Sequence, residues 1–108
     1  MVQTKNLNLS IVKKFRQKAG KIVKISKMIF FGSRTQGHFS NESDFDLIVV
    51  SDDFGKQPFY KRAVGLYAAW KEDYPLELIC YTKKEFREKQ SNPYTLAAQA
   101  VKTGITIQ

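Results

Sequence analysis

Residues 32–50 read GSRTQGHFSNESDFDLIVV, and the pattern of this stretch decides the fold. Its last part, 45–50, is a nearly continuous apolar run rich in β-branched side chains, which predicts a buried strand. A shorter apolar run at 28–31 predicts a second buried strand. Residues 32–43 between them are rich in Gly, Ser, Thr and Asn, so we expect a loop, or a loop with one helical turn. This loop would bridge the ends of the two strands.

Apolar residues at helical spacing predict helices on both sides of this stretch. We expect a helix over residues 10–19, capped by Ser10 and ended by Gly20, with lysines on its solvent side. Pro58 opens another helix, and Pro75 breaks it before a third strand at 76–81. The apolar stripe of this second helix is interpreted as core, and its members are Phe59, Ala63, Leu66, Tyr67 and Trp70.

The C-terminal part of the chain predicts two more helices and an edge strand. Thr82 and Glu85 have the spacing of a capping box, which begins a short charged helix. Pro93 starts the last helix, which Gly104 ends before a short strand at 105–107. Its inward face is expected to carry Leu96, Ala97, Ala100 and Val101. The pattern indicates an α/β or α+β fold, which we expect to be one domain over residues 1–108.

The net charge of +8 is concentrated in the N-terminal third, because no acidic residue precedes Glu42. Such an excess would attract polyanions or an acidic partner surface, although a solvated lysine-rich helix face explains it equally simply. The single cysteine, Cys80, excludes an internal disulfide and is expected to be a buried apolar side chain. The sequence contains no apolar run near the length of a membrane span and no leader pattern, so we expect a cytoplasmic protein.

Asp44 and Asp46 are the first candidate functional residues. Side chains two positions apart on a strand point to the same face, so the two carboxylates would be aimed at one spot. Like charges held close at the start of an apolar strand are unfavourable unless a cation or a proton lies between them. Hard oxygen ligands suit Mg²⁺, which commonly binds one or two carboxylates together with substrate phosphates. The pair therefore predicts a magnesium site.

Gly32 and Ser33 form the second part of the constellation. A glycine at a strand end lets the backbone approach a phosphate closely, and the Ser33 hydroxyl can donate to a phosphate oxygen. Arg34 and Ser43 are further candidate phosphate-binding residues. Neither a Gly-Ser pair nor an Asp-x-Asp pair is specific alone. Their combination, with Gly37 five residues after the first glycine, is considerably more specific.

Glu77 is the candidate third acid, because phosphoryl transfer with two metal ions usually needs more than two carboxylates. It lies inside the predicted strand 76–81, where a charge requires a partner that the metal site would supply. The alternative is that Glu77 faces solvent at an edge or pairs with a lysine. Asp52 and Asp53 are interpreted as solvated turn residues, and His38 as a surface loop residue.

Residues 32–50 resemble the nucleotidyltransferase superfamily related to DNA polymerase β, and particularly its minimal nucleotidyltransferase proteins. The resemblance is carried by Gly32-Ser33, Gly37 and Ser43-Asp44-x-Asp46, and it implies a mixed sheet with helices packed beside it. It further implies two Mg²⁺ ions between Asp44, Asp46 and a third acid, which maps to Glu77, and an NTP whose triphosphate lies on Gly32-Ser33. Minimal nucleotidyltransferases often pair with a helical HEPN-type protein in toxin–antitoxin systems.

The leading functional hypothesis is therefore transfer of a nucleoside monophosphate, with AMP from ATP favoured, to a hydroxyl on a partner protein. A second hypothesis is an antitoxin that sequesters its partner without turnover. A third is a nucleic-acid-binding protein that uses the basic N-terminal helix. The nucleotide base, the acceptor atom and the oligomeric state stay open at this point.

Overall fold

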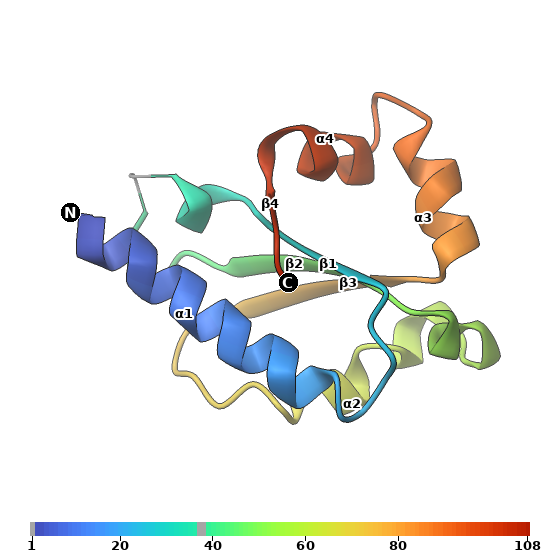
Figure 1. The fold of residues 1–108 in the computed structure, drawn as a ribbon, viewed down its shortest axis with the longest axis horizontal. Helices are drawn as coiled ribbons and strands as arrows, with labels where there is room; N and C mark the ends of the chain where they lie inside the picture. Colours follow the sequence, from blue (N-terminus) through green and yellow to red (C-terminus); the bar gives the residue numbers. More distant parts are fainter. Residues whose placement is uncertain (1, 37–38) are drawn as a thin grey trace.

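Four strands form one mixed sheet in the order β3-β2-β1-β4 in the computed structural model, which describes residues 2–36 and 39–108 (Figure 1). The strands are β1 (Lys27–Phe31), β2 (Phe45–Val50), β3 (Leu76–Tyr81) and β4 (Ile105–Thr106). All four were predicted, with boundaries that differ by one residue at most. The mixed sheet with helices beside it confirms the predicted fold class.

The register of the sheet places the start of β2 beside two other elements. β1 and β2 are antiparallel, so Phe31 at the end of β1 lies opposite Asp46. β2 and β3 are parallel, and here Asp46 lies opposite Glu77. Strand β4 pairs antiparallel with β1 and forms the other edge. The end of β1 and the starts of β2 and β3 therefore meet at one end of the sheet.

Each face of the sheet is covered by its own helices (Figure 1). On one face α1 (Val2–Ala19) and α2 (Val64–Tyr67) pack against side chains such as Phe30, Phe45 and Leu47. On the other face α3 (Lys83–Gln90) and α4 (Leu96–Thr103) cover Ile29 and Ile48. Since β2 is apolar on both faces, its residues read as a continuous apolar run rather than an alternating one.

Helix α1 begins earlier than predicted. Ser10 was expected to cap the helix, but it lies in the interior of Val2–Ala19. The buried face is formed by Ile11, Val12, Phe15 and Ala19, as the spacing predicted. The helix ends at the expected place, where the N–H of Gly20 donates to the Arg16 carbonyl at 2.9 Å.

Residues 58–74, in the connection between β2 and β3, were predicted as one long helix, and this prediction was wrong. The chain forms two 3-10 segments, η2 (Asp52–Lys56) and η3 (Phe59–Lys61), followed by the single turn of α2. Gly65, together with the weak helix former Val64, lowers the helix propensity in the middle of this segment. Of the predicted core stripe only Leu66 is fully buried, whereas Phe59 is 58% exposed and Tyr67 42% exposed.

The two C-terminal helices agree better with the sequence pattern. The capping box is present in full, because Thr82 accepts from the N–H of Glu85 and the Glu85 side chain accepts from the N–H of Thr82. Helix α4 starts later than predicted, with Thr95 as its cap, and it ends at Gly104. Ala97 and Ala100 are buried as expected, but Leu96 and Val101 are exposed, so the inward face is narrower than predicted.

Within the part of the chain that the structure describes, no helix is both long enough and apolar enough to cross a membrane.

Candidate active site

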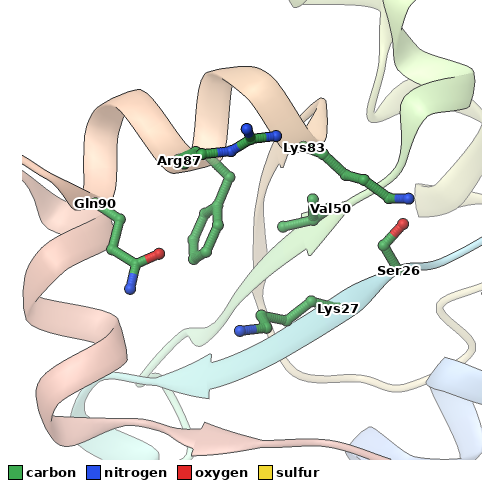
Figure 2. A pocket seen from close by; sticks show the side chains of 7 residues that line it. Ser26, Lys27, Val50, Lys83, Arg87 and Gln90 are labelled. Carbon is green, nitrogen blue, oxygen red and sulfur yellow. The ribbon is translucent and has the colours of Figure 1, made fainter.

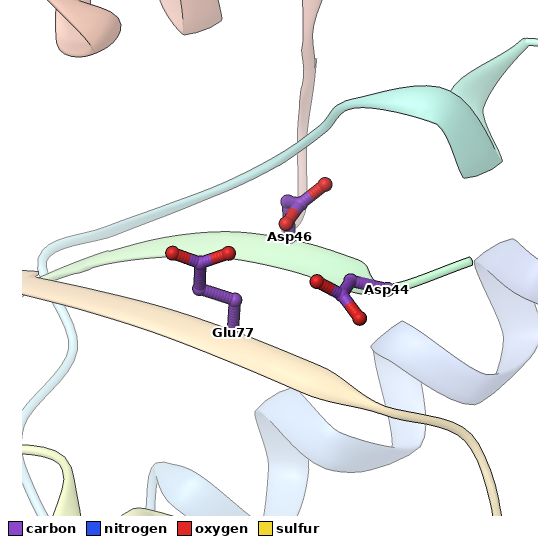
Figure 3. Close-up of side chains that lie close together, drawn as sticks. All are labelled: Asp44, Asp46 and Glu77. Carbon is purple, nitrogen blue, oxygen red and sulfur yellow. The ribbon is translucent and has the colours of Figure 1, made fainter. Parts of the chain in front are cut away.

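Three carboxylates meet where β2 and β3 begin (Figure 3). Asp44 directly precedes β2, Asp46 is its second residue, and Glu77 is the second residue of β3. One oxygen atom from each side chain lies within 4.8 Å of the other two. Asp44 and Glu77 are exposed and Asp46 is half-buried, so the cluster is open to solvent on one side. The structure thus brings together the three acids that the sequence suggested.

The geometry follows from strand periodicity and register. Asp44 and Asp46 are two residues apart and share a face, while Phe45 between them is fully buried on the α1 side. Glu77 joins them because the parallel register of β2 and β3 pairs it with Asp46. Of the alternatives for Glu77, the solvent-facing edge position is present, because β3 is an edge strand and Glu77 is exposed. Among the described side chains Glu77 forms no salt bridge with a lysine, and it lies near the two aspartates.

The pKa of Asp46 is raised. Burial raises the pKa of its carboxyl to about 6, and the negative charges of Glu77 and Asp44 act in the same direction. A cation held between these oxygens would offset the repulsion, and three carboxylates form a hard donor set of the kind that binds Mg²⁺. The donor set therefore fits a divalent metal ion.

Gly32 follows β1 and faces this cluster. Its φ of 88° lies in the region that favours glycine, and a Cβ atom built at this position would collide with the Asp46 carboxylate. Ser33 then begins a 3-10 turn, η1 (Ser33–Thr35), which is closed by a hydrogen bond from the Thr35 hydroxyl to the Gly32 carbonyl at 2.6 Å. The single helical turn expected in this loop is present. Ser33 is exposed and directly follows Gly32, the residue that approaches Asp46.

The comparisons with known proteins agree with this arrangement. A family profile described as a nucleotidyltransferase domain matches residues 11–102. The chain belongs to this family. Among solved structures, a candidate nucleotidyltransferase from Sulfolobus solfataricus superimposes with a TM-score of 0.64 at 16% identity, covering 81% of this chain and 78% of that one. At this identity the similarity supports the shared fold. No protein in a search of curated sequences matches the chain.

Arg34 of the nucleotidyltransferase domain is placed differently from its prediction as a phosphate ligand. Its side chain is 2% exposed and turns toward α1, on the opposite side of the sheet from Asp46. The guanidinium donates to the backbone carbonyls of Ser43, Ser40 and Asn41 at 2.8, 3.1 and 3.1 Å. Since protein acceptors occupy these donors, the Arg34 guanidinium is not directed toward the three acids.

Arg34 instead shapes the segment that leads into Asp44. Its guanidinium carbon lies 4.4 Å from the centre of the Phe45 ring and 4.5 Å from that of Tyr74, so aromatic faces cover it on the α1 side. Ser43, also predicted to bind phosphate, is half-buried, and its hydroxyl accepts from the N–H of Ser40 at 3.0 Å. The Arg34 and Ser43 side chains thus stabilise the conformation of the loop before β2 through hydrogen bonds to its backbone.

Asn8 and Tyr74 contribute to the site without any signal in the sequence. The Asn8 amide donates to the Arg34 carbonyl at 3.1 Å, and its oxygen accepts from the guanidinium at 3.4 Å. Both residues are distant from the motif in sequence. Asn8 is brought to Arg34 by the packing of α1, and Tyr74 by the segment that leads into β3, so their roles become visible only in the folded structure. Gly37 and His38, which the sequence also singled out, lie outside the described residues.

Asp52 and Asp53 lie in the turn after β2, away from the three acids. Asp53 accepts from the N–H of Lys24 at 2.8 Å, and Asp52 accepts from the N–H of Lys83 at 3.0 Å. They are turn residues as predicted, although each also ties the turn to a neighbouring segment.

Proposed function

We propose that this nucleotidyltransferase domain transfers a nucleoside monophosphate from an NTP to a hydroxyl group, with Mg²⁺ held by Asp44, Asp46 and Glu77. The observation that carries the proposal is the convergence of these three carboxylates beside the Gly32-Ser33 turn. The family membership of residues 11–102 supports the transferase class. The donor set supports a divalent cation, and we propose two such ions per site.

In the proposed reaction, the acceptor oxygen forms a bond to the α-phosphorus of the NTP, and the bond from that phosphorus to the pyrophosphate oxygen breaks. The bound ions would supply charge neutralisation of the triphosphate and of the departing pyrophosphate. Glu77 is exposed, and as a carboxylate it is able to accept the proton of the acceptor hydroxyl. Asp46, whose pKa is about 6, is ionised at pH 7 and above and is then available as a ligand.

The triphosphate is assigned to the Gly32-Ser33 turn. Gly32 has no side chain to exclude a phosphate, and the exposed Ser33 hydroxyl is a suitable hydrogen-bond donor. The N–H groups at the start of a helical turn have no acceptor within that turn, which favours an anion at this position. Arg34 and Ser43 are not assigned to phosphate, because Arg34 is buried and bonded and Ser43 supports the loop.

The finer proposal is that the domain transfers AMP from ATP to a partner protein, of the helical HEPN type, as the antitoxin of a toxin–antitoxin pair in the cytoplasm. It rests on the resemblance of residues 32–50 to minimal nucleotidyltransferases. The open side of the carboxylate cluster is compatible with an acceptor presented by a second molecule.

The test is incubation of the protein with α-labelled NTPs, MgCl₂ and the product of the neighbouring gene. We expect label to transfer from ATP, and we expect Asp44→Ala and Asp46→Ala to abolish the transfer. Glu88→Gln removes an exposed acid of α3 and is the matched control, expected to retain activity. Failure of all four labelled NTPs to label any acceptor, or equal labelling by wild type and Asp46→Ala, would overturn the proposal.

Sequestration of a partner without turnover is the second candidate, and the charge of α1 favours it. Lys13, Lys14 and Lys18 of this helix are solvent-exposed. They form a basic surface suited to an acidic partner. The variant Asp46→Asn distinguishes the two candidates. Full neutralisation of the partner by this variant would favour sequestration, and its loss would favour chemistry.

A further inference from the structure

A second concave site lies on the α3 side of the sheet (Figure 2). The strand register places it at the opposite end of the strands from the carboxylates. Its floor is formed by the buried side chains of Val50 and Phe86, and its volume is about 220 Å³. In the β1–β2 ladder Lys27 pairs with Val50, whereas Phe31 pairs with Asp46. Four residues of strand therefore separate the pocket from the acids, which corresponds to about 13 Å.

Three cationic side chains surround this pocket. Lys27 extends from the start of β1, and Lys83 and Arg87 extend from one face of α3, where they are four residues apart. Ser26 and Gln90 add neutral polar groups to the rim. Among the described residues that line the pocket, none is acidic.

The positive charge around the pocket is only partly compensated. The two salt bridges found among the described side chains join Arg62 to Glu85 and Lys83 to Asp52, and the second is long, at 4.0 Å between two exposed groups. Lys27 lies over the Phe86 ring at 5.7 Å from its centre, a contact that does not neutralise the charge of the ammonium group. Cations held around one concavity repel each other, and a multiply charged anion would relieve this repulsion.

We propose that this pocket, defined by Lys27, Lys83, Arg87, Ser26 and Gln90 over Val50 and Phe86, is an anion site for a small oligophosphate. A phosphate group accepts from the guanidinium of Arg87 and from the ammonium groups of the two lysines. A polynucleotide is disfavoured because its backbone requires cations that follow a groove, whereas these three cations line one small pocket. The inference is independent of the proposed function, since the carboxylates take no part in it.

The experiment is calorimetric titration of the whole protein with tripolyphosphate in EDTA. Without a divalent ion the carboxylate cluster repels the anion, so the heat measured reports the basic pocket. We expect the double variant Lys27→Gln/Arg87→Gln to weaken binding by about tenfold or more, because it removes two charged donors. The matched control is Lys13→Gln/Lys14→Gln, which changes the net charge equally at a separate surface pocket on α1 and should leave binding unchanged.

A second pair of variants covers the case in which the double variant fails to fold, as judged by circular dichroism. Gln90→Glu adds a carboxylate to the rim of the pocket and should weaken binding, whereas Gln17→Glu adds one beside the α1 pocket and should not. Absence of saturable binding by the wild type, or equal weakening in both double variants, would overturn the site. Tighter binding of a short single-stranded RNA that also depends on Lys27 and Arg87 would overturn its assignment to a small anion.

Discussion

The backbone at Gly32 passes so close to the Asp46 carboxylate that any side chain at position 32 would occupy the space of the carboxylate oxygen. The absence of a side chain at Gly32 is therefore what leaves room for the Asp46 carboxylate, although the two residues lie on different segments of the chain. This contact gives the glycine a role besides the phosphate approach that the sequence suggested.

Substitution of Gly32 by alanine is expected to destabilise the protein by about 2 kcal/mol or more, because it combines a positive φ with a steric collision. Chemical denaturation measures the change. Gly65→Ala is the matched control, since no atom lies within 4 Å of a Cβ added there and its φ is unstrained. A Gly32→Ala protein as stable as wild type would show that the Asp46 side chain rotates away freely.

Substitution of Asp46 by asparagine should stabilise the metal-free protein at pH 8. The folded-state pKa of Asp46 is about 6, above the ordinary value of 3.8 for an aspartate, so its contribution favours folding below pH 4 and is lost as the pH rises through 6. Allowing for solvent screening of a half-buried group, the gain at pH 8 is about 1 kcal/mol.

The measurement is the free energy of unfolding in EDTA between pH 4 and pH 8, for wild type and Asp46→Asn. The difference between them should grow with pH across this window. Addition of MgCl₂ should reverse the order at pH 8, because the wild type keeps all three carboxylates as ligands. A difference that does not change with pH would contradict the raised pKa.

Substitution of Arg34 by glutamine should cost about 2–4 kcal/mol of stability, since it leaves the carbonyls of the preceding loop without their charged donor. It should also weaken metal binding, because Ser43 and Asp44 are adjacent. Arg62→Gln is the control: Arg62 is the other buried arginine, and it is bonded to Glu85 and to the Cys80 carbonyl, away from the acids.

The two arginine variants are compared by unfolding and by Mn²⁺ titration at a temperature where both are folded. Equal loss of stability with weaker Mn²⁺ binding in Arg34→Gln alone is the expected result. Equal Mn²⁺ affinity in both variants would assign Arg34 a structural role only.

Ionised Glu85 is expected to increase the free energy of unfolding, and this contribution should be lost at acidic pH. Its hydrogen bonds with Arg62 lower its pKa to about 2, and the capping contacts with Thr82 act in the same direction. A lowered pKa contributes stability above the unfolded value of about 4.5, and this contribution is lost as the pH falls toward 2. Glu85→Gln should therefore cost about 1–2 kcal/mol at pH 7 after allowance for partial exposure.

Acid titration of unfolding checks this expectation, with Glu88→Gln as an exposed control on the same helix. The destabilisation by Glu85→Gln should shrink steadily below pH 4. A destabilisation of the same size at pH 2.5 and pH 7 would exclude the ionised pair as its cause.

Local sequence patterns predicted the elements that are determined by residues close together in the sequence, namely the strands and the helix cap. The apolar runs marked β1, β2 and β3, and the spacing of Thr82 and Glu85 marked the cap of α3. The segment 58–74 was mispredicted because its aromatic spacing suits a helix, whereas Gly65 and the β-branched Val64 favour short turns. Phe59, predicted as core, is consequently exposed.

The candidate site was predictable to the extent that it depends on strand periodicity. Asp44 and Asp46 share a face because they are two apart, and the motif pointed to both. Arg34 was misassigned because a short motif does not reveal which side of the sheet a neighbouring side chain takes. Its partner Asn8 and its aromatic cover Tyr74 come from distant segments, and no local pattern contains that information.

The parallel pairing of β2 with β3 determines when the three carboxylates come together during folding. Glu77 reaches Asp46 only after the chain has closed a long loop, whereas Asp44 and Asp46 are neighbours in every conformation. A metal ion that requires all three would therefore bind late on the folding pathway, and it would slow unfolding more than it speeds folding. The signal of a fluorescent or paramagnetic ion at this position would report when β2 pairs with β3.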